Sequence, residues 1–206
     1  GGYTNTTISK DFTQLNTDED VKSIKDFLST YQSPSGGTPM GDALKKAKSL
    51  LDTDNTGNQK YVLFFTDGLP GYYETYNTND DSSRFNCMVA NSAVNYANDI
   101  KAKATIYTVG YKLSGKLYWH QGDSATSWYG YHQNHDLSTS ASVFLKDYIA
   151  TTAQEGSNKK YAYTVDKTAD LEAEFKKLAA QIGAYYSINA EKIVDENWNG
   201  NERLNF

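Results

Sequence analysis

Two short, largely apolar runs of residues mark the centre of the expected fold. Residues 61–65 read Tyr-Val-Leu-Phe-Phe, and residues 104–111 read Ala-Thr-Ile-Tyr-Thr-Val-Gly-Tyr. Short runs without regular polar alternation are typical of strands that are buried on both faces of a sheet. We therefore expect both segments to be interior strands, with a third strand at residues 161–165.

Apolar residues at helical spacing predict the helices between these strands. The first helix is indicated by a capping-box pattern, because Thr17 is followed three positions later by Asp20. A second helix is expected to open with Thr38 as the N-cap and Pro39 at the first helical position. The expected helices cover residues 18–31, 39–51, 89–100, 143–149 and 171–182.

The order of these elements predicts the topology. A strand, a helix and a further strand in sequence form a right-handed parallel crossover, which places both strands in one sheet. We expect an α/β fold with a doubly wound, mostly parallel sheet. Loose alternation in residues 1–15 favours a short edge strand. Residues 185–194 resemble one or two strands, so residues 184–206 are expected to be a linker or the start of a neighbouring β domain.

Two polar and aromatic stretches, residues 71–85 and 112–140, are expected to be loop insertions. The second contains Trp119, Trp128 and Tyr129, which could form a ligand-binding surface or pack the loop onto the domain. Both alternatives stay open. The stretch also holds all three histidines. Of these, His132 and His135 could share a face and bind a transition metal, but without a predicted helix or a third ligand we interpret them as solvated loop residues.

Composition narrows the class of protein. The 206 residues carry 25 acidic and 20 basic side chains without a basic stripe, so nucleic acid is an unexpected partner. The lone cysteine, Cys87, excludes an internal disulfide framework and a four-thiolate zinc site. No run of about 18 apolar residues is present, so no membrane span is expected.

Candidate chemistry lies where the first apolar run ends. Asp67 follows that run directly, and ligands bind at the carboxyl ends of strands in open α/β sheets. Asp67 could bind a metal or only form a turn before Gly68, and Thr38 could be a metal ligand or only an N-cap. No nucleophile–base pair or paired carboxylates can be assigned, so we do not expect an enzyme.

Four segments together resemble motifs of the von Willebrand factor A (VWA) family. Their matching residues are Gly36-Gly37-Thr38-Pro39-Met40-Gly41-Asp42-Ala43-Leu44, Phe64-Phe65-Thr66-Asp67-Gly68, Ile106-Tyr107-Thr108-Val109-Gly110 and Asp170-Leu171-Glu172-Ala173-Glu174-Phe175-Lys176-Lys177-Leu178-Ala179. The resemblance covers residues 1–183, which we take as one domain.

The resemblance implies a metal-ion-dependent adhesion site for Mg²⁺, or for Mn²⁺ or Ca²⁺. Thr38 would ligate the cation, and Asp67 would bind it directly or through water. A hard cation suits these oxygen ligands. An acidic group of a partner would complete the shell. The family also uses an Asp-x-Ser-x-Ser loop after its first strand, and the chain is expected to begin after that strand. We expect an upstream segment or a second chain to complete the sheet.

Asp136, Ser138 and Ser140 match the Asp-x-Ser-x-Ser pattern letter for letter. They are candidate metal ligands, but no apolar strand precedes them, and the alternative is an N-cap before the helix at Val143.

The expected function is that of a surface adhesion or ligand-binding domain. The polar surface and long insertions are similar to the A domains of Gram-positive surface and pilus-tip adhesins, which implies an extracellular, cell-wall or pilus-associated location and a host protein or glycan as the ligand. The alternative is a structural or assembly module without a functional metal site.

Overall fold

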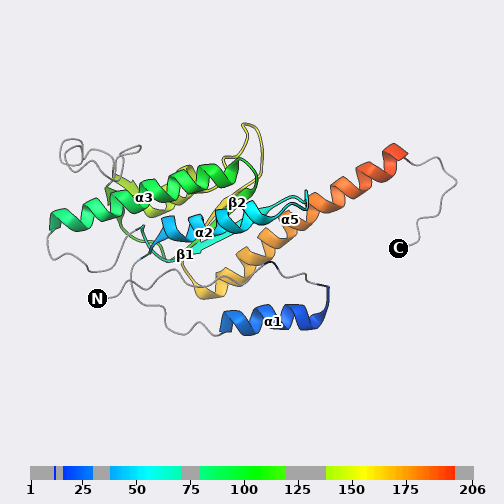
Figure 1. Ribbon diagram of the computed structural model, residues 1–206, viewed down its shortest axis with the longest axis horizontal. Coiled ribbons are helices and arrows are strands. Elements are labelled where there is room, and N and C mark those ends of the chain that lie inside the picture. The colour runs from blue at the N-terminus through cyan, green and yellow to red at the C-terminus, as the bar shows by residue number, and fades with distance from the viewer. Residues whose placement is uncertain (1–11, 13–15, 30–37, 71–78, 119–137, 198–206) are drawn as a thin grey trace. The chain divides into compact units, whose positions relative to one another are not determined.

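The computed structural model describes residues 12, 16–29, 38–70, 79–118 and 138–197 (Figure 1). The chain divides into two compact units, residues 1–164 and 165–206. In chain order the elements are α1 (Asp18–Ser29), α2 (Met40–Thr53), β1 (Tyr61–Thr66), α3 (Asn79–Lys101), β2 (Thr105–Tyr111), β3 (Lys116–Tyr118), β4 (Ser138–Ser140), α4 (Ala141–Phe144), the π-helix η1 (Leu145–Ile149), β5 (Ala162–Val165) and α5 (Thr168–Asn197).

The main sheet has three described strands in the order β1-β2-β5. The pairing of β1 with β2 is parallel, as predicted, and aligns Tyr61 with Thr105 and Thr66 with Gly110. On its other side, β2 is hydrogen-bonded to β5, so β2 is the central strand. Next to this pairing, the Thr108 N–H donates to the carbonyl of Tyr161, the residue before β5, over 2.8 Å. The chain is therefore a mixed α/β protein built around a parallel sheet.

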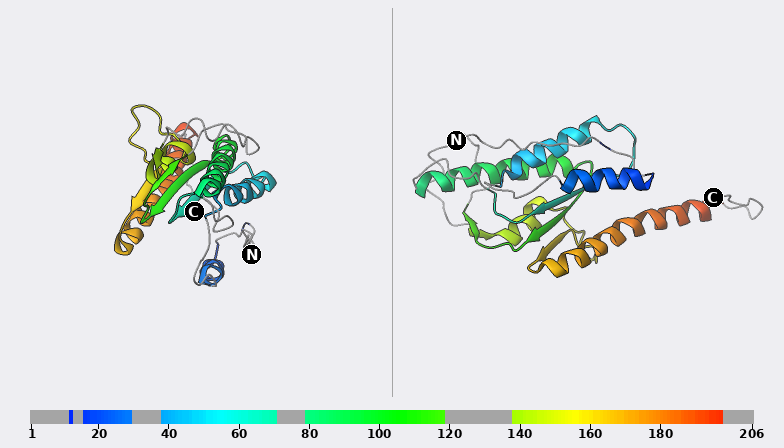
Figure 2. Two further views of the ribbon diagram at one scale, coloured as in Figure 1. Left: turned by 90° about the vertical axis from the view of Figure 1, so that its left-hand side faces the viewer. Right: turned by 90° about the horizontal axis from the view of Figure 1, so that it is seen from below.

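One face of this sheet is covered by α2, α3 and η1. Val62 and Phe64 of β1 and Ile106 of β2 pack into the same cluster as residues of these helices. Figures 1 and 2 show α2 and α3 side by side, as their contacts require. Phe144 is fully buried in this core. The helices therefore bury the even-numbered side chains of both strands, as the alternation of a strand demands.

The other face of β1 corrects the expectation that residues 61–65 are buried on both sides. Leu63 and Phe65 are each 47% exposed. Strand β2 behaves as predicted, because Ile106 to Gly110 are all buried. The difference follows from position: β2 has a neighbour on each side, whereas β1 is the outermost of the described strands.

Helix α2 lies unusually close to α3 at Gly41. A Cβ atom built at this glycine would lie 2.5 Å from the Ser92 Oγ and 2.8 Å from the Ser92 Cβ. Gly41 is buried, so the contact is made inside the fold. A residue without a side chain is thus required for this helix–helix approach.

The predicted capping box at α1 is confirmed. The Asp20 N–H donates to the Thr17 hydroxyl over 3.2 Å, and the Thr17 N–H donates to an Asp20 carboxylate oxygen over 3.0 Å. These bonds satisfy groups that a helix N-terminus leaves without partners. The Thr17 hydroxyl, together with backbone N–H groups, lowers the pKa of Asp20.

Three expectations about the irregular stretches need correction. The insertion expected over residues 71–85 is helical from Asn79 onward, because α3 begins there. The insertion at 112–140 contains β3 and β4, which pair antiparallel. The strands expected at residues 185–194 are helical, because α5 continues to Asn197. The edge strand expected in residues 1–15 lies almost wholly outside the described residues. No helix in the described ranges is long and apolar enough to cross a membrane.

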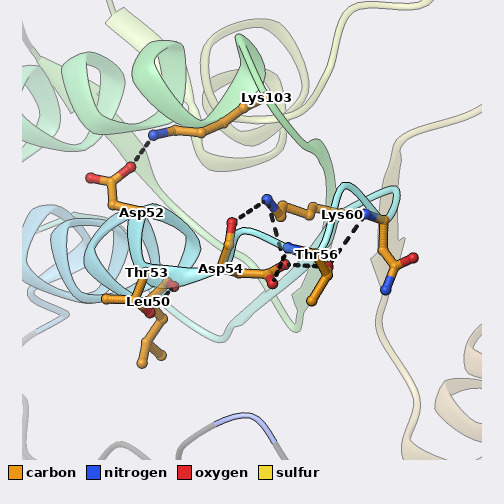
Figure 3. A network of polar contacts seen from close by, with 8 residues as sticks. Leu50, Asp52, Thr53, Asp54, Thr56, Lys60 and Lys103 are labelled. Atoms are coloured by element: carbon orange, nitrogen blue, oxygen red, sulfur yellow. Dashed lines mark hydrogen bonds and ion pairs between the residues drawn. The ribbon is translucent and has the colours of Figure 1, made fainter.

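A polar network fixes the amino ends of β1 and β2 (Figure 3). Lys60, just before β1, donates to the Asp54 carbonyl over 2.9 Å. Lys103, just before β2, forms an ion pair with Asp52, which also binds Lys48. The hydrogen bonds from Lys103 and then Lys48 lower the pKa of Asp52 below its ordinary value of 3.8. The network therefore ties α2 to both strands.

We expect Asp52→Asn to reduce stability at neutral pH and to have less effect in acid. A carboxyl group whose folded-state pKa is lowered stabilises the fold above its unfolded pKa, and that contribution is lost as pH falls through the folded value. The free energy of urea unfolding should be compared for wild type and variant between pH 7 and pH 3. The difference should shrink below pH 3.8. Asp166→Asn, at an exposed site outside the network, is the control. A difference that is constant across this range would contradict the assignment.

Candidate functional site

The carboxyl end of β1 forms a short turn. Thr66 is buried, and its hydroxyl accepts a hydrogen bond from the Gly68 N–H over 3.3 Å. A hydroxyl that binds a backbone group two residues later stabilises such a turn. Asp67, the residue between them, is exposed. The turn therefore presents the Asp67 carboxylate to solvent at the edge of the sheet where ligands bind in α/β proteins.

Thr38 lies against this turn, although 28 residues separate Thr38 from Thr66 in the sequence. Its Oγ1 atom is only 2.5 Å from the position that a Cβ atom of Gly68 would occupy. Any side chain at Gly68 would displace the hydroxyl. The two predicted metal ligands, Thr38 and Asp67, thus come to the same edge, with Gly68 allowing the close approach.

The start of α2 differs from the prediction. The helix begins at Met40 with Pro39 as its N-cap, and the cap makes no side-chain hydrogen bond. The Thr38 carbonyl accepts a hydrogen bond from the Met40 N–H over 2.8 Å. Thr38 is therefore not the N-cap, and Pro39 is not the first helical residue. The physical reason is that the Thr38 hydroxyl lies against Gly68 instead of the first turn of the helix.

The carboxyl end of β2 adds a positively charged side chain, that of Lys112, to the same edge. Gly110, which pairs with Thr66, ends the buried part of the strand, and a Cβ there would clash with the Leu113 side chain. Lys112 adopts a left-handed conformation with φ of 51°, and its amine lies 5.1 Å from the centre of the Tyr111 ring. Such backbone conformations are uncommon outside glycine and cluster at functional sites. Lys112 was not among the residues predicted for this edge, because no sequence pattern marks a lysine with positive φ.

The oxygen donors at the edge suit a hard cation, but the described ranges supply few of them. Thr38 offers a neutral hydroxyl and Asp67 a carboxylate, both ligand types that Mg²⁺ and Ca²⁺ accept. Among the residues that the structure describes, no group of three or more His, Cys, Asp or Glu side chains could hold a metal ion. A cation here would therefore depend on a hydroxyl, water and an oxygen from elsewhere to complete its coordination.

The remaining site candidates have other roles or lie outside the description. Ser138 and Ser140 are on β4, where they pair with Tyr118 and Lys116. Ser140 is the N-cap of α4, and its hydroxyl accepts from the Val143 N–H over 3.3 Å. This is the capping role that was the alternative to metal binding. Asp136, together with Trp119, Trp128 and Tyr129, lies outside the described residues.

Comparison of the chain with protein-family models, curated proteins and solved structures gives no significant match.

Proposed function

We propose that this chain is an adhesion or ligand-binding domain of the VWA type, which contacts its partner through a divalent cation held at the carboxyl edge of the sheet. The cation is Mg²⁺, or Mn²⁺ or Ca²⁺ in its place, and Thr38 and Asp67 are its ligands. An acidic group of the partner supplies a further oxygen. The extracellular, cell-surface location belongs to the same proposal.

The position of the Thr38 hydroxyl is the observation that carries this proposal. A threonine before a helix ordinarily caps it, but α2 makes no side-chain cap bond. The hydroxyl lies instead beside Gly68, next to the Asp67 carboxylate in sequence. Two oxygen donors from segments far apart in the chain therefore face one edge, and neither is required for the helix start.

The proposed chemistry follows from this small donor set. Mg²⁺ keeps several waters when few protein oxygens are available, and an octahedral shell leaves positions open for a partner. One neutral and one anionic ligand leave net positive charge on the ion, which favours an acidic partner group. Lys112, at the end of the neighbouring strand, would add to this attraction.

Cation binding should depend on Asp67. We expect Asp67→Ala to weaken Mg²⁺ and Mn²⁺ binding at least about 100-fold, because losing even an outer-shell partner costs about 10- to 100-fold. Thr38→Ala should weaken binding by a smaller factor, and Gly68→Ala should do the same by displacing the Thr38 hydroxyl. Titration calorimetry, with melting temperature followed against cation concentration, measures these effects.

Asp166→Ala is the matched control, since Asp166 is an exposed aspartate beyond β5. It should bind the cation as wild type does. Equal affinities for wild type and Asp67→Ala would overturn the metal assignment, and so would a wild-type melting temperature that does not respond to Mg²⁺.

The second candidate function is a structural or assembly module without a working metal site. The exposed Leu63 and Phe65 on β1 favour it, because large apolar side chains at the outermost described strand are typical of a contact surface. This alternative predicts normal partner assembly in the presence of a chelator, whereas the first requires the cation.

A further inference from the structure

A pocket of about 250 Å³ opens between strand β5 and the helical segment made of α4 and η1. Its lining residues lie between positions 142 and 164, inside the unit of residues 1–164, and include neither proposed cation ligand. Residues three or four apart on a helix share a face, and alternate residues of a strand do the same. The helical wall presents Ser142, Val143 and Lys146, and the strand wall presents Lys160, Ala162 and Thr164.

The pocket is positively charged, although the chain has a formal net charge of -5. The described residues that line it include two lysines and no aspartate or glutamate. The Lys146 side chain is 73% exposed, and its ion pair with the adjacent Asp147 spans 3.7 Å. Such an exposed pair contributes little, so the charge of Lys146 can serve an anion. The Lys160 amine lies 4.9 Å from the centre of the Tyr163 ring, so a second positive charge stands on the strand wall.

The pocket also has an apolar part and a hydroxyl. Val143 is 41% exposed, and Leu145 and Ala162 line the same space. The Ser142 hydroxyl lies 3.3 Å from the Ser140 hydroxyl, which is long for a bond between two hydroxyl groups. An inorganic anion could use the lysines and the Ser142 hydroxyl but would leave the apolar side chains uncovered. The lining therefore fits an anion that carries an aliphatic body.

The backbone at Lys146 supports a binding role. Leu145 and Lys146 belong to η1, where the Ala150 N–H donates to the Leu145 carbonyl over 2.8 Å. This is the bond between residues five apart that defines a π-turn, and π-turns are rare and frequent at functional sites. The irregular turn thus lies in the part of the helical segment that lines the pocket.

We propose that this pocket binds a small organic carboxylate. Lys146 and Lys160 attract the carboxylate, the Ser142 hydroxyl donates to it, and the aliphatic body lies against Val143 and Leu145. The pocket has the volume of about eight water molecules at ~30 Å³ each, so a ligand of about eight non-hydrogen atoms, such as hexanoate, matches it. Drug-sized ligands occupy pockets of about 300–1,000 Å³. This inference does not depend on the proposed cation site.

Titration of the full chain with hexanoate, followed by nuclear magnetic resonance, tests the proposal at constant ionic strength. We expect saturable chemical-shift changes at the backbone amides of residues 142–146 and 160–164. Butyrate should bind more weakly, by up to about fourfold for each methylene that it lacks. Hexanamide lacks the charge and inorganic phosphate lacks the aliphatic body, so each should bind at least about fivefold more weakly than hexanoate.

Variants of Lys146 provide a second measurement. Lys146→Met keeps the aliphatic stem and removes the charge, so it should weaken hexanoate binding by about fivefold or more, whereas Lys146→Arg should retain it. Lys22→Met is the matched control, since Lys22 is 71% exposed and also pairs with a nearby aspartate, Asp26. It should bind hexanoate as wild type does. Circular dichroism checks that the variants fold.

Several results would overturn the assignment of this pocket. They are the absence of saturable changes with hexanoate, changes confined to residues outside the pocket, and binding of hexanamide or phosphate as tight as that of hexanoate. An unchanged affinity in Lys146→Met would overturn it equally. The comparison of hexanoate with hexanamide uses the wild-type chain, so it decides the question whatever the variants do.

Discussion

Replacing Phe144 with alanine is expected to lower the free energy of unfolding by about 3–5 kcal/mol. Phe144 is completely buried, and its ring stacks on Tyr148 with centroids 5.9 Å apart. It lies at the junction of α4 and η1, in the cluster that also receives residues of α2, α3 and the sheet. The cavity left by the ring would be bordered by several elements and could not collapse at one place alone.

Val143→Ala is the control for this experiment. Val143 is the preceding residue of the same helix and is 41% exposed, so its truncation should cost less than about 1 kcal/mol. Urea unfolding at constant pH measures both variants, and unchanged m-values would show that the unfolded states are comparable. A loss below about 1 kcal/mol for Phe144→Ala would mean that the core does not close around this ring.

The replacement of Gly41 by alanine is expected to destabilise the protein by about 1–3 kcal/mol. In an open helix the same change would stabilise by about 1 kcal/mol, because glycine has poor helix propensity. At Gly41 the added Cβ would meet the Ser92 Cβ at 2.8 Å, and a Cβ atom cannot move without its backbone. The predicted sign is therefore opposite to the propensity effect.

A double-mutant cycle with Ser92→Gly isolates this contact. Removing the Ser92 side chain should cost about 0.5 kcal/mol in helix propensity, and in the double variant it should relieve most of the clash that Gly41→Ala creates. Coupling of at least about 1 kcal/mol between the two substitutions is the expected result. Additive effects would show that α2 and α3 do not approach as closely as described.

Local sequence patterns predicted the elements that are stabilised by hydrogen bonds between near neighbours or by burial of a largely apolar run. The runs at residues 61–65 and 104–111 became β1 and β2, in parallel register. The capping box at Thr17 and Asp20 formed as expected, since all its partners lie within four residues. In each case the sequence pattern and the stabilising contacts cover the same short segment.

Helix ends were predicted less well, because a helix can extend beyond the residues that stabilise it. Helix α3 begins at Asn79, ten residues before Val89, the first apolar position of the expected face. Residues 185–194 contain Tyr, Ile and Val, which favour strands, yet α5 continues through them to Asn197. Propagating an existing helix adds one bond per residue and needs no new nucleus, so it can override such weak preferences.

The candidate site could be predicted only in part. The resemblance to VWA motifs implied that Thr38 and Asp67 belong to one site, and in the structure Thr38 lies beside Gly68. The sequence could not show that Pro39, not Thr38, is the N-cap of α2. The position of the cap depends on where the Thr38 hydroxyl points, which is set by packing against residues far away in the chain. The exposure of Leu63 and Phe65 could not be predicted either, since the sequence of a strand does not show how many strands lie beside it.

The small antiparallel pair of β3 and β4 limits the stability cost of a change in length between these two strands. Tyr118 is held opposite Ser138, so the ends of the 119–137 segment are fixed together whatever residues lie between them. Doubling the length of such a closed segment costs only about 0.6 kcal/mol in closure entropy. A change in the number of residues between Tyr118 and Ser138 should therefore cost little stability, provided that the pairing of β3 with β4 is kept.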